Sequence, residues 1–155
     1  MTKQVPEPPP TTAEVRARMQ RMPRRDTKPE MALRRELHRR GLRYRTSFRP
    51  LDGLRCQADI VFTGQRVACF VDSCHWHACE EHLRVPKTNT AWWERKLSAT
   101  KARDERNNRV LTDAGWIVVR VWEHEDSGVA ADRIEAIVRS RLDSGRQTQF
   151  QNQNR

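Results

Sequence analysis

Several features are missing from this sequence, and each absence excludes a class of protein. No apolar run is long enough to cross a membrane, so we expect no membrane partner. Residues 1–10 hold four prolines and no apolar stretch of the signal-peptide kind, so we expect a cytoplasmic protein of bacterial type. No internal repeat is present, and 155 residues are enough for one domain with a real core but hardly two.

Acidic residues are few relative to basic ones, and the imbalance is local. The chain has 30 Lys and Arg against 20 Asp and Glu, which gives a formal charge of +10 and a pI near 10.5. The window from Arg16 to Arg49 holds thirteen of the basic residues and three acidic ones, so its net charge equals the +10 of the whole chain. Such clustering indicates a polyanionic partner; the alternative is a solvated basic surface.

Periodicity, capping residues and turns predict a small mixed α/β domain over residues 12–143. We expect a flexible arm over residues 1–11 and a disordered, Gln- and Asn-rich tail over residues 144–155. The predicted helices cover residues 12–22, 28–40, 91–113 and 128–142, and the predicted strands cover residues 42–48, 58–62, 66–72 and 116–122. Thr27 is the expected N-cap of the second helix, and Thr90 that of the third.

Two carboxylates gain interest from their positions in these elements. Glu30 stands at the capping-box position and shares a helix face with Leu33 and Leu37, so it points toward the core; a capping role alone explains it equally well. A tight turn over residues 63–65 pairs the strands on either side and brings Asp59 near Val71, with the register left open. The alternative for Asp59 is a surface carboxylate at a strand start.

Cysteine is scarce, and half of it lies in one stretch. Four cysteines in a cytoplasmic chain are metal ligands or buried thiols rather than a disulfide framework. The spacing Cys74-x4-Cys79-x2-His82 offers three donors suited to zinc, and His124, which follows an apolar strand, is our choice of fourth ligand. The competing fourth ligands are His75, His77, Cys69 and Cys56, and the alternative to zinc is an unmetallated cluster of buried thiols.

A hydrolytic site is also consistent with this region. An aspartate at the start of one strand, Asp59, a carboxylate near the end of its partner strand, Asp72, and a histidine just beyond, His77, form a workable set. Oxygen ligands of this kind suit Mg²⁺, which would stabilise charge on a phosphodiester while His77 deprotonates or orients the attacking water.

Several separated motifs together resemble the very-short-patch-repair (Vsr) DNA mismatch endonucleases. They come in the family's order over roughly residues 15–142: DTKPE at 26–30, ADIV at 58–61, FVDSCHWHACEEH at 70–82, PKTNT at 86–90, Trp93, GW at 115–116 and VWEHE at 121–125. The resemblance implies a restriction-endonuclease-like core that nicks one DNA strand beside the thymine of a T:G mismatch arising from 5-methylcytosine deamination. It further implies double-stranded DNA as substrate, a functional link to a cytosine-5 DNA methyltransferase and a repair polymerase, action as a monomer, and a place at the nucleoid.

By position, the resemblance carries roles onto individual residues of this chain. Asp59 matches the Mg²⁺-binding aspartate, the backbone carbonyl of Val71 a second metal contact, and His77 the histidine that activates water. Glu30 matches a helix glutamate that supports the metal–water network. Structural zinc positions fall on Cys74, Cys79, His82 and His124, and the aromatics that wedge into the base stack fall on Trp76 and Trp93. Core packing is the alternative for both tryptophans.

Three positions depart from the family pattern. His75 stands where the family has Phe, so one wedge residue is replaced by a ring that also forms hydrogen bonds. Asp72 stands where some members have a second active-site histidine, which favours metal binding and leaves the proton-transfer scheme open. Cys56-Gln57-Ala58 precedes Asp59, where a proline is frequent.

Overall fold

A computed structural model describes residues 12–153 of the chain, and the side chains of residues 12–145. Its elements confirm the expected mixed α/β order: α1 (Ala13–Arg21), α2 (Lys28–Arg39), β1 (Arg45–Phe48), β2 (Ala58–Phe62), β3 (Val67–Asp72), α3 (Thr90–Asp113), β4 (Ile117–Trp122) and α4 (Ser127–Gln153). The expected arm over residues 1–11 lies outside the described residues. Among those described, no helix is both long and apolar enough to span a bilayer.

The four strands form one sheet in the order β1-β2-β3-β4. β1, β2 and β3 are antiparallel neighbours, whereas β4 runs parallel to β3 because the long helix α3 carries the chain back between them. The β2–β3 hairpin pairs Ile60 with Cys69. Because β3 has β2 on one side and β4 on the other, it lies inside the sheet and is buried along most of its length, as its apolar sequence predicts. This arrangement brings the end of β3, where the chemistry-bearing stretch begins, beside the ends of β2 and β4.

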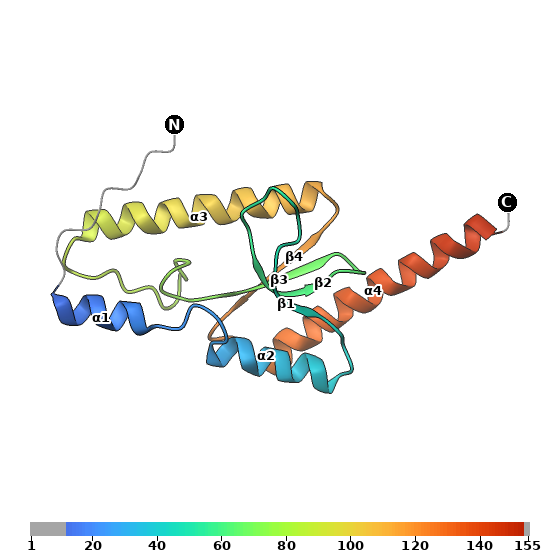
Figure 1. Cartoon of the computed structure of the whole chain (residues 1–155), viewed down its shortest axis with the longest axis horizontal. Coiled ribbons are helices and arrows are strands. Elements are labelled where there is room, and N and C mark those ends of the chain that lie inside the picture. Colours follow the sequence, from blue (N-terminus) through green and yellow to red (C-terminus); the bar gives the residue numbers. More distant parts are fainter. Residues whose placement is uncertain (1–11, 154–155) are drawn as a thin grey trace.

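Helices cover both faces of the sheet, with α3 along one face and α2 and the start of α4 along the other (Figure 1). The α2–α4 side holds the larger apolar cluster, in which Leu37, Phe62 and Ile134 are fully buried. The α3 side is built around Phe70, Leu111 and Trp116. Successive strand side chains point to opposite faces and supply both clusters. Packing on both faces therefore fixes the sheet from which the site projects.

The predicted start of α2 is confirmed. Thr27 caps the helix, its backbone amide lies 3.4 Å from Oε2 of Glu30, and the two residues form a capping box. Glu30 is buried together with Leu33 and Leu37, as their shared helix face predicts. Gly41 follows at a φ of +75°, a left-handed conformation that favours glycine and ends the helix.

Two expectations about helix ends were wrong. Asn89, at a φ of 61°, caps α3 in place of Thr90, whose hydroxyl instead donates to the carbonyls of Pro86 and Lys87 at 3.2 Å. The tail expected to be disordered from residue 144 is helical, because α4 continues to Gln153 and projects from the body of the molecule (Figure 1). Its Gln and Arg residues are good helix formers and no proline interrupts them, so Gly145 alone is too weak to end the helix.

Truncating the core side of α4 is expected to be costly. Ile134→Ala removes a side chain with 0% exposure and should lower the free energy of unfolding by about 2–5 kcal/mol. Val129→Ala, on the same helix but 63% exposed, should change it by less than about 0.5 kcal/mol. Urea denaturation with an unchanged m-value measures both. Equal losses in the two variants would contradict this packing.

Candidate active site

The β2–β3 hairpin places Asp59 directly beside the end of β3. The backbone amide of Val71 donates to Oδ2 of Asp59 at 2.7 Å, which confirms that the turn brings the two together. Asp59 and Val71 line a pocket of about 1140 Å³ together with residues of α1, α2, α3 and the loop after β3, among them Glu30, Trp76, His77, Lys96 and Arg103. A hollow of this size, lined by cations and aromatics, suits a nucleic-acid strand better than one small molecule.

Asp59 is a carboxylate largely removed from water that accepts a hydrogen bond from a backbone amide. Burial raises its pKa to about 6, and the hydrogen bond from Val71 only partly opposes the shift. The negative charges of Glu30 and Asp72 raise it further. A cation at Asp59 would relieve this strain, and the donor set of carboxylate and backbone oxygens is the kind that divalent cations such as Mg²⁺ prefer.

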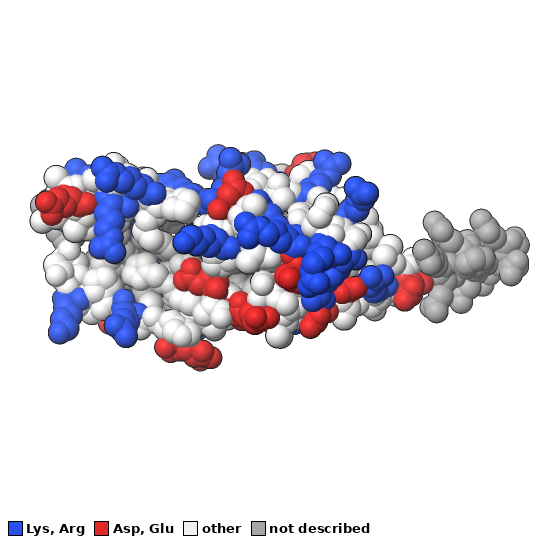
Figure 2. Space-filling view, turned by 90° about the horizontal axis from the view of Figure 1, so that it is seen from below, with Lys and Arg blue, Asp and Glu red and all other residues white. Residues whose placement is uncertain are grey.

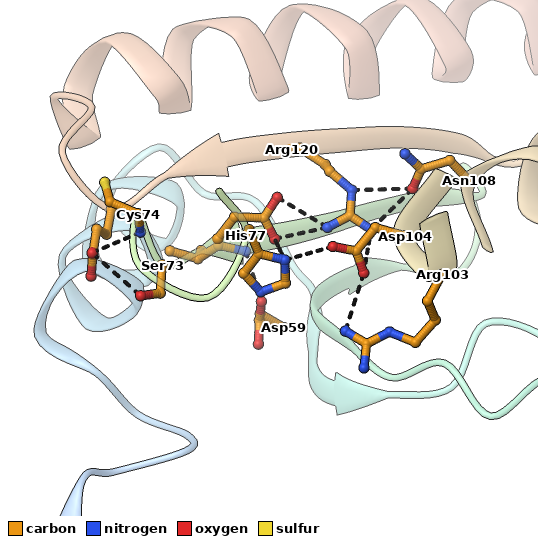
Figure 3. A network of polar contacts seen from close by, with 11 residues as sticks. Asp59, Ser73, Cys74, His77, Arg103, Asp104, Asn108 and Arg120 are labelled. Carbon is orange, nitrogen blue, oxygen red and sulfur yellow. Dashed lines mark hydrogen bonds and ion pairs between the residues drawn. The ribbon is translucent and has the colours of Figure 1, made fainter. Parts of the chain in front are cut away.

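His77 is held by an aspartate that the sequence did not single out. Its Nδ1 lies 2.6 Å from Oδ2 of Asp104 on α3 and 3.7 Å from Oδ1 of Asp72 (Figure 3). Burial raises the pKa of Asp104, but the hydrogen bond with His77 and the charge of Arg120 outweigh it, so the net shift is downward. An ionised carboxylate at this distance makes Nδ1 the protonated nitrogen and leaves Nε2 as the acceptor.

Glu30 and Asp72 are both buried, with 2% and 4% exposure, and each is paired with an arginine. Arg34 binds Glu30 from one turn further along α2, and also Asp26 at 2.6 Å. Arg120 of β4 donates to both oxygens of Asp72, at 2.8 and 3.0 Å. Asp72 was expected to make metal binding easier, but its oxygens are occupied by a guanidinium.

One feature of the sequence does mark the position of Asp104. Trp93, Leu97 and Leu111 mark one face of α3, and the positions between them on that face are polar. Asp104 stands in this gap, and Asn107 beside it is buried at 7% exposure. A polar interruption in a buried stripe points to a polar site beneath the helix. Arg120 gave a similar signal, as a charged residue within an apolar strand.

The expected metal ligands converge. The donor atoms of Cys74, Cys79, His82 and His124 all lie within 4.8 Å of one another. Sγ of Cys74 is 3.1 Å and Sγ of Cys79 is 3.9 Å from Nδ1 of His124. Tetrahedral zinc with sulfur and nitrogen ligands sets its donors about 3.3–3.8 Å apart, so small shifts of these side chains would bring the cluster to that geometry. Of the competing ligands, Cys69 is fully buried in the core, and none of the four belongs to the group.

The predicted wedge residues also gather in one place. Ring centroids of Trp76 and Trp93 are 5.7 Å apart, and His75 lies 5.0 Å from the first and 5.2 Å from the second. Nζ of Lys96 sits 4.8 Å from the ring of Trp76 and 4.7 Å from that of Trp92. Trp93 is 9% exposed, so the core-packing alternative holds for it in the free protein.

Basic side chains surround the entrance to this site. Figure 2, which views the molecule from the side of α1 and α2, shows lysines and arginines spread over that face with fewer acidic groups between them. The arginines of α1 are exposed, and Arg16 and Arg24 line the pocket itself. Two carboxylates and an oriented imidazole beneath a basic, aromatic surface define a phosphodiester-cleaving enzyme of the nuclease class.

Known proteins bear this out. The family model for the DNA mismatch endonuclease Vsr matches residues 10–82. The type II nicking enzyme V.NaeI of Lentzea aerocolonigenes is 46% identical over 133 residues, which is 84% of this chain and 78% of that protein. V.XorIIP of Xanthomonas oryzae pv. oryzae is 37% identical over 81% of this chain and 89% of its own length, and the DNA mismatch endonuclease Vsr of Escherichia coli K12 is 35% identical over 64% and 62%. The chain belongs to the Vsr family of endonucleases.

The raised pKa of Asp59 predicts a pH-dependent effect on stability. Without divalent cation, ionising this buried carboxylate opposes folding, so its cost appears as pH rises from about 4 through about 6. Asp59→Asn keeps an acceptor for the Val71 amide and removes that charge. In magnesium-free buffer the free energy of unfolding of the variant should exceed that of the wild type by up to about 3 kcal/mol at pH 7. At pH 4 the two should differ little. Urea titrations at both pH values measure this; a pH-independent difference would contradict it.

Proposed function

We propose that this protein is a Mg²⁺-dependent endonuclease that nicks one strand of double-stranded DNA beside the thymine of a T:G mismatch. The observation that carries the proposal is the meeting of Asp59, hydrogen-bonded to the Val71 amide, with the His77–Asp104 pair beneath one basic pocket. Asp59 and the carbonyl of Val71 would hold Mg²⁺, with Glu30 supporting its waters. Bound there, the ion would stabilise negative charge on the phosphodiester.

The chain's own residues then move the proton. Asp104 accepts the Nδ1 hydrogen of His77 and fixes the ring, so Nε2 is free to take a proton from the attacking water. Asp104 remains ionised and stabilises the imidazolium that forms, without itself becoming protonated. Arg16 and Arg24 at the pocket and the exposed arginines of α1 would bind the backbone phosphates.

Mismatch recognition would come from the aromatic cluster. A mismatched pair costs less to unstack, so Trp76, Trp93 and His75 would insert selectively beside it. Their packing in the free protein covers part of each ring until DNA replaces those contacts. We further propose a restriction-endonuclease-like core over residues 12–143, action as a monomer, and a functional link to a cytosine-5 methyltransferase and a repair polymerase.

A nicking assay tests the function directly. Purified protein with Mg²⁺ is mixed with a library of duplexes carrying each single mismatch and with matched duplexes, and the cut positions are mapped. We expect one nick beside the thymine of T:G, lost in Asp59→Ala, while that variant still binds DNA. Equal cutting of matched DNA would reduce the protein to a less specific nickase. Binding without cutting by the wild type would leave a DNA-binding module without catalysis.

The Cys74, Cys79, His82 and His124 cluster would hold one structural zinc ion. Nδ1 of His124 faces the sulfurs while its Nε2 lies 3.6 Å from Glu81, the carboxylate contact that orients a zinc-binding imidazole. The ion would tie the loop after β3 to the end of β4. It supplies no step of the reaction; the loop that it fixes carries Trp76 and His77.

Zinc removal should therefore unfold this part of the chain. We expect about one equivalent of zinc per protein by elemental analysis. Chelation should lower the melting temperature together with metal content, because the binding free energy of such a site is folding free energy. Cys79→Ser should lose the metal, whereas Cys69→Ser, which alters a thiol outside the cluster, should retain it. A metal-free protein that melts at the same temperature would overturn the assignment.

A further inference from the structure

One guanidinium connects the two carboxylates that flank the imidazole of His77. Nη1 of Arg120 donates to both oxygens of Asp72, and Nη2 lies 3.8 Å from Oδ1 of Asp104. The other edge of the group is also used: Nε and Nη2 donate to Oδ1 of Asn108, at 3.1 and 3.0 Å (Figure 3). Its Cζ atom lies 4.5 Å from the ring centroid of Phe70, so the group has partners on both edges and on one face.

Strand register explains why Arg120 reaches both carboxylates. In the parallel β3–β4 pair, Arg120 stands opposite Phe70, and Asp72 follows Phe70 by two residues on the same face of the sheet. That face is the one covered by α3, where Asp104 and Asn108 are one turn apart. Arg120 therefore joins β3, β4 and α3 directly beneath His77.

His77 has two carboxylates within reach of one ring nitrogen. Its Nδ1 is 2.6 Å from Asp104 and 3.7 Å from Asp72, and one N–H forms a short, well-aligned bond with only one of them. Two hydrogen bonds from Arg120 hold the carboxylate of Asp72, so it does not compete with Asp104 for the N–H of His77. Without them, Asp72 would be a buried, unpaired charge that turns to the nearest donor, which is His77.

We propose that Arg120 is a positioning residue of the nicking reaction, which acts by holding Asp72 so that His77 bonds to Asp104 alone. The inference rests on the proposed function, because it gives His77 the proton-accepting role. Arg120 does not line the pocket at Asp59, so it acts through His77 and not on the DNA. Asn108 fixes its far edge and shares the role.

Arg40 offers a matched control. It is a similarly half-buried arginine, with 19% side-chain exposure against 22% for Arg120, and it also bridges two carboxylates, Asp132 and Glu135. It joins α2 to α4 on the opposite face of the sheet. Arg40→Ala should lose stability as Arg120→Ala does, without touching His77.

Single-turnover nicking and DNA affinity are measured for both alanine variants at a temperature where circular dichroism shows them folded. Arg120→Ala should nick about 100-fold more slowly with its dissociation constant for DNA unchanged, because a small misplacement of a catalytic group has that effect. Millimolar guanidinium chloride, but not sodium chloride, should restore part of the rate. Arg40→Ala should nick at the wild-type rate. Equal rates for Arg120→Ala and the wild type would overturn the proposal.

Arg120→Lys keeps the test valid if the alanine variant does not fold. A lysine has one ammonium and no planar fork, so it cannot bind both oxygens of Asp72 while Asn108 fixes its other edge. Asp72 is then held less firmly, and a rate reduced about 10-fold is expected. Nitrogen NMR of ¹⁵N-histidine protein should show Nδ1 of His77 protonated in the wild type and altered nitrogen shifts in Arg120→Lys. An unchanged His77 spectrum would contradict the positioning role. This readout is independent of cleavage, so inactivity of the wild type would sink the proposed function without deciding the role of Arg120.

Discussion

Negative charge gathered at the end of β3 is the constraint around which the site is built. Glu30, Asp59, Asp72 and Asp104 come from different elements and are all partly or wholly removed from water. Burying a carboxylate is costly unless a cation or donors compensate it. Three of the four have a nearby partner: Arg34, Arg120 and His77. Asp59 has a single backbone amide, so it alone keeps its electrostatic demand for a cation.

The loop after β3 needs support from outside itself, because residues 73–89 contain neither helix nor strand. Contacts with two other parts of the chain provide this support. At one end, Glu123 beyond β4 accepts a hydrogen bond from the amide of Cys74 at 2.9 Å, beside the cluster of sulfur and imidazole donors. At the other, Asp104 holds His77 from α3. Residues 74–82 are thus attached at two points, beside the cysteines to the end of β4 and at His77 to α3.

Sequence reasoning reached the parts of the site that depend on local pattern. The tight turn over residues 63–65 was enough to pair Asp59 with Val71, and ligand spacing together with an apolar strand was enough to choose His124. Asp104 and Arg120 were not predicted as site residues because their partners lie 27 and 48 residues away, and the polar interruptions that mark them on α3 and β4 do not indicate which residues they contact. The predicted disorder of residues 144–153 was wrong for a different reason: a polar composition also suits an exposed helix, because Gln is a good helix former.

The long helix α3 contacts the aromatic cluster, the imidazole of His77 and the apolar core in turn. Trp93 in its first turn packs with Trp76, Asp104 near its middle binds His77, and Leu111 in its last turn anchors the helix against the sheet. At about 1.5 Å per residue, the eleven-residue step from Trp93 to Asp104 covers about 16 Å of the helix axis. Both ends of that step contact neighbouring residues of the same loop, Trp76 and His77. The neighbouring side chains of Trp76 and His77 therefore contact different turns of α3, so one helix fixes both ends of this short segment of the loop.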